Sequence, residues 1–167
     1  MPDKRTIEKA REDKREGKSA STQAGEFVRA EIDKIRHGEH GARSARQAIA
    51  IGLSEARRAG VDLPPPAKGK TSARTRRSAK YAYDVGQGKR KPHRRPRVAR
   101  AVEAVLEREP RRAASHRALS RQDKRAASRR TASQRADAAR KASRTKGAAG
   151  RSAAAKKAAR TRARRRG

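Results

Sequence analysis

The chain has 167 residues, of which 49 are Lys or Arg and only 17 are Asp or Glu, so its formal net charge is +32. Aromatic residues make up 2% of the chain, cysteine and tryptophan are absent, and alanine dominates the hydrophobic residues. This composition excludes a disulfide framework and a large apolar core, and it favours a polyanionic partner and substantial disorder.

No segment has the pattern of a membrane or secretory element. Residues Met1 to Lys18 alternate acids and bases and lack the apolar stretch of a secretory signal. No apolar run approaches the roughly 20 residues that span a bilayer. We therefore expect a cytoplasmic protein with no membrane partner.

Charge divides the chain into regions. Residues 1–63 carry a net charge of +3, residues 64–96 carry +10, residues 97–110 are neutral, and residues 111–167 carry +19. Almost all of the excess therefore lies in the second and fourth regions. This division predicts that the N-terminal half forms the packed part of the protein and that the C-terminal half binds anions.

Two helices are expected in the front half, as a helical hairpin domain over residues 22–63. In residues 22–36 apolar side chains recur at helical spacing, with Thr22 as the expected N-cap and Gly38 as the end of the helix. Residues 1–21 form a charged N-terminal segment, either an exposed helix or a frayed tail.

The second helix is predicted to begin after Ser44. Ser44 and Gln47 have the spacing of a capping box, and Gly60 stands where a C-terminal glycine cap belongs. Between them runs a stripe of mostly small residues, so the first helix could approach closely after a turn at residues 38–41. The stripe consists of Ala45, Ala48, Ile49, Gly52, Leu53 and Ala56.

Ile51 lies outside this stripe, among polar residues of the same helix. It is interpreted either as a single exposed isoleucine or as a contact with the third helix or a second subunit. A homodimer therefore stays open as an alternative to a monomer.

The rest of the chain is expected to be loosely organised. Residues 64–96 are interpreted as a proline-containing basic linker with an irregular patch at Tyr81–Gly88. The pattern of residues 97–110 predicts a short third helix. Residues 111–167 form an Ala/Arg/Lys-rich tail, and we expect segments of it to become helical when DNA neutralises their charge. The expected fold is mostly α: a small helical hairpin plus a short third helix, with a long disordered or conditionally helical basic extension.

The second helix contains Gln47-Ala-Ile-Ala-Ile-Gly-Leu-Ser-Glu-Ala-Arg57 after a glycine-bearing turn. This segment resembles an uncharacterised family of small, very basic bacterial proteins that share a Gln-Ala-Ile-Ala-Ile-x-Leu-Ser-Glu-Ala-Arg helix. The resemblance extends from near Phe27 to Gly60 and implies DNA binding through charge, with no known activity or cofactor. The tail from Arg111 is similar in composition to linker-histone and bacterial histone-like tails.

The bases outside the front half are the candidate nucleic-acid contacts, because arginine can hold phosphate through two parallel hydrogen bonds. Nothing in the tail predicts a rigid element that would read base edges, and few aromatic residues could stack on RNA bases. We therefore expect binding that is tight at low salt and nearly indifferent to sequence. The candidate residues are Lys68, Lys70, Arg74, Arg76, Arg77, Lys80, Lys89, Arg90, Lys91, Arg94, Arg95, Arg111, Arg112, Arg129, Arg130, Lys156, Lys157, Arg160, Arg162, Arg164, Arg165 and Arg166.

The sequence thus predicts a histone-like protein of the bacterial nucleoid that neutralises and compacts DNA. An RNA- or ribosome-associated protein, and an adaptor that binds a protein partner through the hairpin, are the alternatives. An enzyme is not expected, and neither is a cofactor, a small-molecule substrate or a metal, because His37 and His40 lack an evident third ligand.

Overall fold

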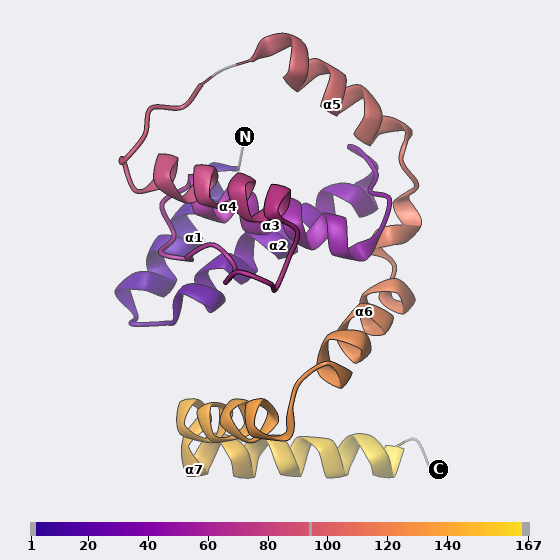
Figure 1. Cartoon of the computed structure of the whole chain (residues 1–167). Helices are drawn as coiled ribbons and strands as arrows, with labels where there is room; N and C mark the ends of the chain where they lie inside the picture. Colours follow the sequence, from indigo (N-terminus) through magenta and orange to yellow (C-terminus); the bar gives the residue numbers. More distant parts are fainter. Residues whose placement is uncertain (1–2, 94, 165–167) are drawn as a thin grey trace. The chain divides into compact units, whose positions relative to one another are not determined.

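The computed structural model describes residues 3–93 and 95–164, apart from the side chains of residues 145 and 146. Within these ranges every regular element is helical, so the expectation of a mostly α fold is confirmed (Figure 1). None of the described helices combines the length and apolar character that crossing a membrane requires. The helices are α1 (Lys4–Arg15), α2 (Ala20–His37), α3 (Ala45–Arg58), α4 (Ala73–Gly86), α5 (Pro96–Arg108), the 3₁₀ helix η1 (Arg111–Ala114), α6 (His116–Ser128) and α7 (Ala132–Arg164).

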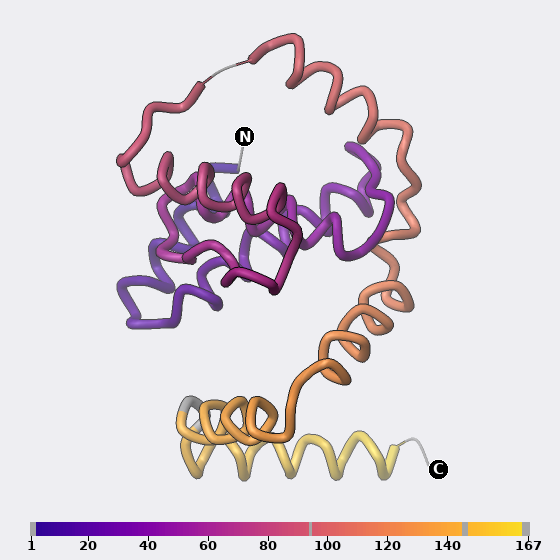
Figure 2. The backbone as a smooth tube through the Cα atoms, in the orientation of Figure 1, coloured from indigo at the N-terminus to yellow at the C-terminus, as the bar shows by residue number. Residues whose placement is uncertain are grey.

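Contacts between residues divide the chain into two units, Met1–Gln122 and Asp123–Gly167. In the first unit, α2 and α3 form the expected hairpin and make the most extensive contact between two elements (Figure 2). A Cβ added at Gly52 would lie only 2.7 Å from the Cα of Val28 and 2.9 Å from the carbonyl oxygen of Phe27. The close approach expected from the small-residue stripe is therefore confirmed.

The N-termini of these helices are capped partly as expected. Ser44 Oγ accepts a hydrogen bond from the Gln47 N–H at 3.2 Å, as in a capping box. Gln47 Oε1 accepts from the N–H of Arg43 at 3.0 Å, one residue earlier than that motif requires. The expected cap at Thr22 is wrong, because the N-cap is Ser19, three residues earlier, and α2 begins at Ala20.

Gly60 ends α3 as expected. Its φ is +91°, a left-handed conformation that glycine adopts without strain. The N–H groups of Gly60 and Val61 donate to the carbonyl oxygens of Arg57 and Ala56, both at 3.1 Å, which is the Schellman pattern. Val61 and Ala56 are both buried in one apolar cluster with Phe27, so the cap also closes the core.

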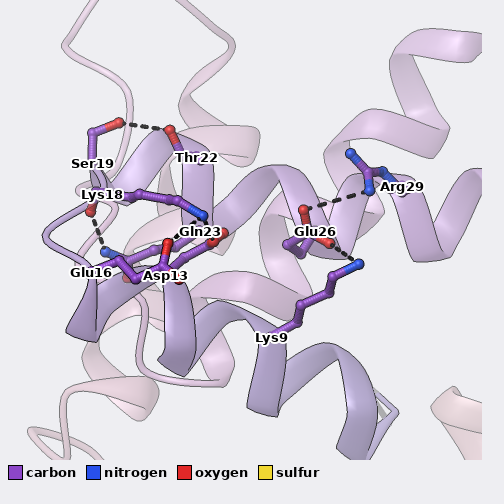
Figure 3. A network of polar contacts seen from close by, with 9 residues as sticks. All are labelled: Lys9, Asp13, Glu16, Lys18, Ser19, Thr22, Gln23, Glu26 and Arg29. Atoms are coloured by element: carbon purple, nitrogen blue, oxygen red, sulfur yellow. Dashed lines mark hydrogen bonds and ion pairs between the residues drawn. The ribbon is translucent and has the colours of Figure 1, made fainter. Parts of the chain in front are cut away.

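The charged N-terminal segment is part of the packed unit rather than a frayed tail. In α1, Ala10 and Asp13 are buried, and Ala10 belongs to the cluster around Phe27. Figure 3 shows the polar contacts at the junction of α1 and α2: Lys18 Nζ lies 2.7 Å from Asp13 Oδ1. Gln23 Nε2 donates to the carbonyl of Lys18 at 2.8 Å. These contacts supply the order that an isolated helix would lack.

The expected linker over residues 64–96 is wrong over much of its length. It contains α4, which also replaces the irregular patch expected at Tyr81–Gly88. Ser72 Oγ caps the first turn, and the buried residues Ala79 and Ala82 belong to a helix that packs on α3. Alanines give almost no hydrophobic signal in the sequence, so this packing face escaped prediction.

Helix α5 occurs where a third helix was expected, but the tail begins later than predicted. Ala113 and Ala114 of η1 are buried in a second apolar cluster around Ile35. Arg36 Nε donates to the carbonyl of Ala114 at 3.0 Å. Residues 111–114 therefore belong to the folded unit and not to the extension.

The disordered alternative for the tail is not supported in the described residues, because α6 and α7 are helical, and a gain of helix on binding DNA stays a prediction. Alanine, arginine and lysine are strong helix formers, which explains the difference. A break at Gly147 divides α7 into two stretches that lie side by side in Figures 1 and 2. Arg151 joins them by donating to the carbonyl and hydroxyl oxygens of Ser143, both at 2.8 Å.

Candidate nucleic-acid interface

Helix α4 is fixed against the C-terminal end of α3. The backbone of Gly86 approaches that of Arg57 so closely that a Cβ at Gly86 would collide with it. The Tyr83 hydroxyl donates to Asp62 Oδ1 at 2.6 Å, which raises the pKa of Tyr83. Gln87 Nε2 donates to the carbonyl of Gly60 at 3.3 Å. One side of α4 is therefore held, and the opposite side faces solvent.

Arg57 helps to hold this region together and was missed by sequence reasoning. Its side chain is 7% exposed, and it donates to the carbonyl oxygens of Leu63 at 3.0 Å and Leu53 at 3.3 Å. Burial lowers the pKa of the guanidinium. Its position four residues after Leu53 continues the predicted stripe, and that was the signal for its burial.

The solvent side of α4 carries the predicted cations Arg74, Arg76, Arg77 and Lys80, all of which are exposed. At helical spacing they form two rows. One row runs through Arg74, Arg77 and Tyr81. The other runs through Arg76, Lys80 and Tyr83.

Each row ends in a tyrosine that holds a cation from the loop after α4. The guanidinium carbon of Arg90 lies 5.0 Å from the ring centroid of Tyr81, and Lys89 Nζ lies 5.8 Å from that of Tyr83. The His93 N–H donates to the Tyr81 hydroxyl at 2.8 Å, which holds the loop in place. These cation–π contacts fix two predicted cations beside α4 and cover the only two tyrosines of the chain.

The other predicted cations of the first unit lie along its surface. Lys68 and Lys70 precede α4, and Arg111 lies against the turn at Gly38. The remaining exposed positions are Lys91 after α4, Arg95 at the N-cap of α5, and Arg112 in η1. Arg94 lies outside the described residues.

In the second unit the predicted cations are exposed on α7 and in the turn before it. Arg129 and Arg130 lie in that turn, and Lys156, Lys157, Arg160, Arg162 and Arg164 lie on the second stretch of α7. The acid of this helix, Asp137, pairs with Arg140 at 2.7 Å. Arg165 and Arg166 lie outside the described residues.

A buried charged cluster lies between α2 and α3. Glu31 is 1% exposed, and its Oε1 lies 3.5 Å from His40 Nε2. Burial is the largest influence on this carboxyl and raises the pKa of Glu31. Lys34 Nζ lies 3.9 Å from Glu55 Oε1 nearby. Sequence reasoning missed Glu31, although its place between Phe27 and Ile35 at helical spacing was a signal of burial.

Among the described residues, neither His37 at the end of α2 nor His40 in the following turn belongs to a metal-binding cluster. His40 faces Glu31, whereas His37 Nδ1 lies 2.8 Å from the carbonyl of Asp33. Within residues 3–93 and 95–164, no group of three or more histidine or carboxylate side chains is arranged to hold a metal ion.

Helix α5 exposes an apolar face. Val98, Val102 and Val105 recur at helical spacing and are 52–56% exposed. The segment that contains them is the neutral one of the chain, with three bases and three acids over residues 97–110. Ile51, by contrast, is partly buried on α3.

Comparison with known proteins connects only the first part of the chain to a family. Residues 3–68 match the model of a family of unknown function, DUF6496. This match covers α1, α2 and α3 and ends before α4 begins. Neither the curated proteins nor the solved structures include a match to this chain. The chain is thus similar to that family over its N-terminal helices.

Proposed function

We propose that this protein binds nucleic acid without regard to sequence, with DNA as its main partner, as a histone-like component of a bacterial nucleoid. The observation that carries the proposal is the display of exposed cations on the helices of both units. In α7 the sequence places 11 bases against one acid. Such an excess is suited to a phosphate backbone.

The side chains favour contact with phosphate over the reading of bases. Phe27 is fully buried, and Tyr81 and Tyr83 already hold cations of their own chain. Stacking on single-stranded bases requires free aromatic faces. Exposed arginines require only phosphate oxygens, which every sequence offers.

A salt titration tests the proposal. Binding of the full chain to two unrelated duplexes of about 30 bp is measured by fluorescence anisotropy between roughly 50 and 200 mM salt. If about ten phosphates are neutralised, the slope of log K against log salt is near −9, and both duplexes bind with similar affinity. Absence of binding at the lowest salt overturns the proposal. Competition with ribosomal RNA at equal salt distinguishes the DNA-binding function from the RNA-binding alternative.

The second candidate is a protein-binding function, favoured by the exposed valines of α5. If a second copy of the chain is the partner, sedimentation equilibrium should give twice the mass of 18.4 kDa. Val102→Lys should then restore the monomer, and Ile51→Lys tests the other candidate contact in the same way. If the protein is a monomer at every concentration measured, the homodimer is excluded.

A further inference from the structure

We propose that α4 and the loop after it form the main docking surface for the phosphate backbone, and that α7 adds charge without a fixed site. This inference rests on the proposed function and makes it more specific. The surface, here named the α4 cationic face, consists of Arg74, Arg76, Arg77, Lys80, Lys89 and Arg90.

The α4 cationic face has dimensions suited to a nucleic-acid backbone. From Arg74 to Tyr81 the helix rises by about 10 Å, since each residue contributes about 1.5 Å. Each strand of a duplex carries one negative charge per roughly 3.4 Å of the axis, so this length runs beside about three phosphates of one strand. The two rows with their loop cations provide enough positive groups to pair with all of them.

Three arginines of this face have no polar partner among the described residues, whereas Arg90 lies over the ring of Tyr81. In the part of the chain that the structure describes, no hydrogen bond or ion pair involves the side chains of Arg74, Arg76 or Arg77. Lys80, in contrast, pairs with Asp84 at 2.6 Å. The three guanidinium groups are therefore ready to bind an external anion without first breaking an internal contact.

Their place on the helix is unfavourable without such an anion. Arg74, Arg76 and Arg77 lie in the first turns of α4, where no acidic residue accompanies them. The positive end of the helix dipole repels cations there, most strongly in the first turn and at low ionic strength. A bound phosphate chain would offset this repulsion, so binding should also stabilise the folded unit.

The face is also carried by a helix that packs on the fold, unlike the cations of α7. Helix α4 is held on α3 through Ala79, Ala82 and the Tyr83–Asp62 hydrogen bond. Helix α7 exposes nearly all of its described residues and has no comparable packed face. A surface whose backbone is already fixed loses less conformational entropy on binding, so each of its cations contributes more to affinity.

Two variants of the full chain with equal charge loss test this inference. Arg74, Arg76 and Arg77 are replaced by Gln in one, and Arg160, Arg162 and Arg164 of α7 in the other. At about 100 mM salt we expect the α4 variant to lose at least tenfold more affinity for duplex DNA than the α7 variant. Equal losses, or a larger loss in the α7 variant, overturn the inference while the proposed function stands. Failure of the unchanged protein to bind contradicts the proposed function itself.

A second measurement uses the unchanged protein and does not depend on the folding of a variant. Arginines are modified with phenylglyoxal, with and without DNA, and the products are identified by mass spectrometry. Strong protection of Arg74, Arg76 and Arg77 relative to Arg160 and Arg164 is expected. Uniform protection of all five overturns the inference.

Discussion

At the scale of single residues, Glu31 shows how burial works against a charge. The carboxyl group is buried, and the imidazole Nε2 of His40 lies 3.5 Å from its Oε1. Removing a carboxylate from water disfavours its charged form, and the attraction of His40 and Lys34 does not fully compensate. The pKa of Glu31 is therefore higher in the folded chain than in the unfolded chain.

Because the pKa of Glu31 differs between the folded and unfolded states, the stability of the folded chain depends on pH. Because the folded state binds the Glu31 proton more tightly, protonated Glu31 favours folding, and this contribution is lost as the pH rises through the raised pKa. We predict that Glu31→Gln raises the Tm relative to the unchanged protein at about pH 7, and that the gain shrinks towards about pH 4. Thermal unfolding followed by circular dichroism at both pH values measures it.

The exposed residue Glu8 on α1 provides the control, since Glu8→Gln removes the same charge without changing a buried site. A gain for Glu31→Gln that stays constant with pH would contradict the expected role of its burial.

Residue-scale prediction from sequence succeeded for hydrogen bonds at helix ends and failed for burial set by the chain that follows a helix. The Ser44 cap and the Gly60 C-terminal cap depend on neighbours within a few residues, and both were predicted. Arg57 is buried because the chain returns along Leu63 to cover it. The spacing of Arg57 after Leu53 places it on the predicted stripe, but that spacing does not determine which carbonyl groups of the following segment accept its hydrogen bonds.

At the scale of elements, the α2–α3 crossing depends on the missing side chain at Gly52. We predict that Gly52→Ala destabilises the protein by about 1–3 kcal/mol, because the new methyl group meets the α2 backbone and cannot be accommodated by a rotamer change. This loss should exceed the gain of about 1 kcal/mol that alanine brings to a helix. Chemical denaturation measures the difference.

Gly25 is the matched control, because it also lies inside a helix but has nothing within 4 Å of an added Cβ. Gly25→Ala should stabilise the protein by about 0.5–1 kcal/mol. If both substitutions change stability in the same direction, the close approach of the two helices does not limit residue 52.

The elements that sequence reasoning misjudged share one physical property. Helix α4 and η1 pack through alanines, namely Ala79, Ala82, Ala113 and Ala114. Such side chains bury little area, and their clusters are surrounded by arginine and lysine, so the segments were interpreted as linker and tail. Helix α5, whose valines recur at helical spacing, was predicted correctly even though it buries none of its residues.

At the scale of the whole molecule, the same excess of cations acts on folding and on binding in opposite directions. A net charge of +32 repels itself, and this repulsion lowers the stability of every compact part. Dissolved ions screen it within a Debye length of about 10 Å at 0.1 M salt. The same ions compete with the protein for phosphate and weaken its binding to DNA.

We therefore predict that raising sodium chloride from about 50 to 200 mM raises the Tm by several degrees while the affinity for duplex DNA falls by about 10³-fold or more. Differential scanning calorimetry and anisotropy titrations in the same buffers measure both quantities.

The variant with Gln at residues 74, 76 and 77 should show a smaller rise in Tm, because it removes three cations from one helix, where they repel one another most. A Tm that falls with salt would mean that internal ion pairs such as Lys18–Asp13 and Lys80–Asp84 outweigh the repulsion, and that the cationic surface costs the fold little when no anion is bound.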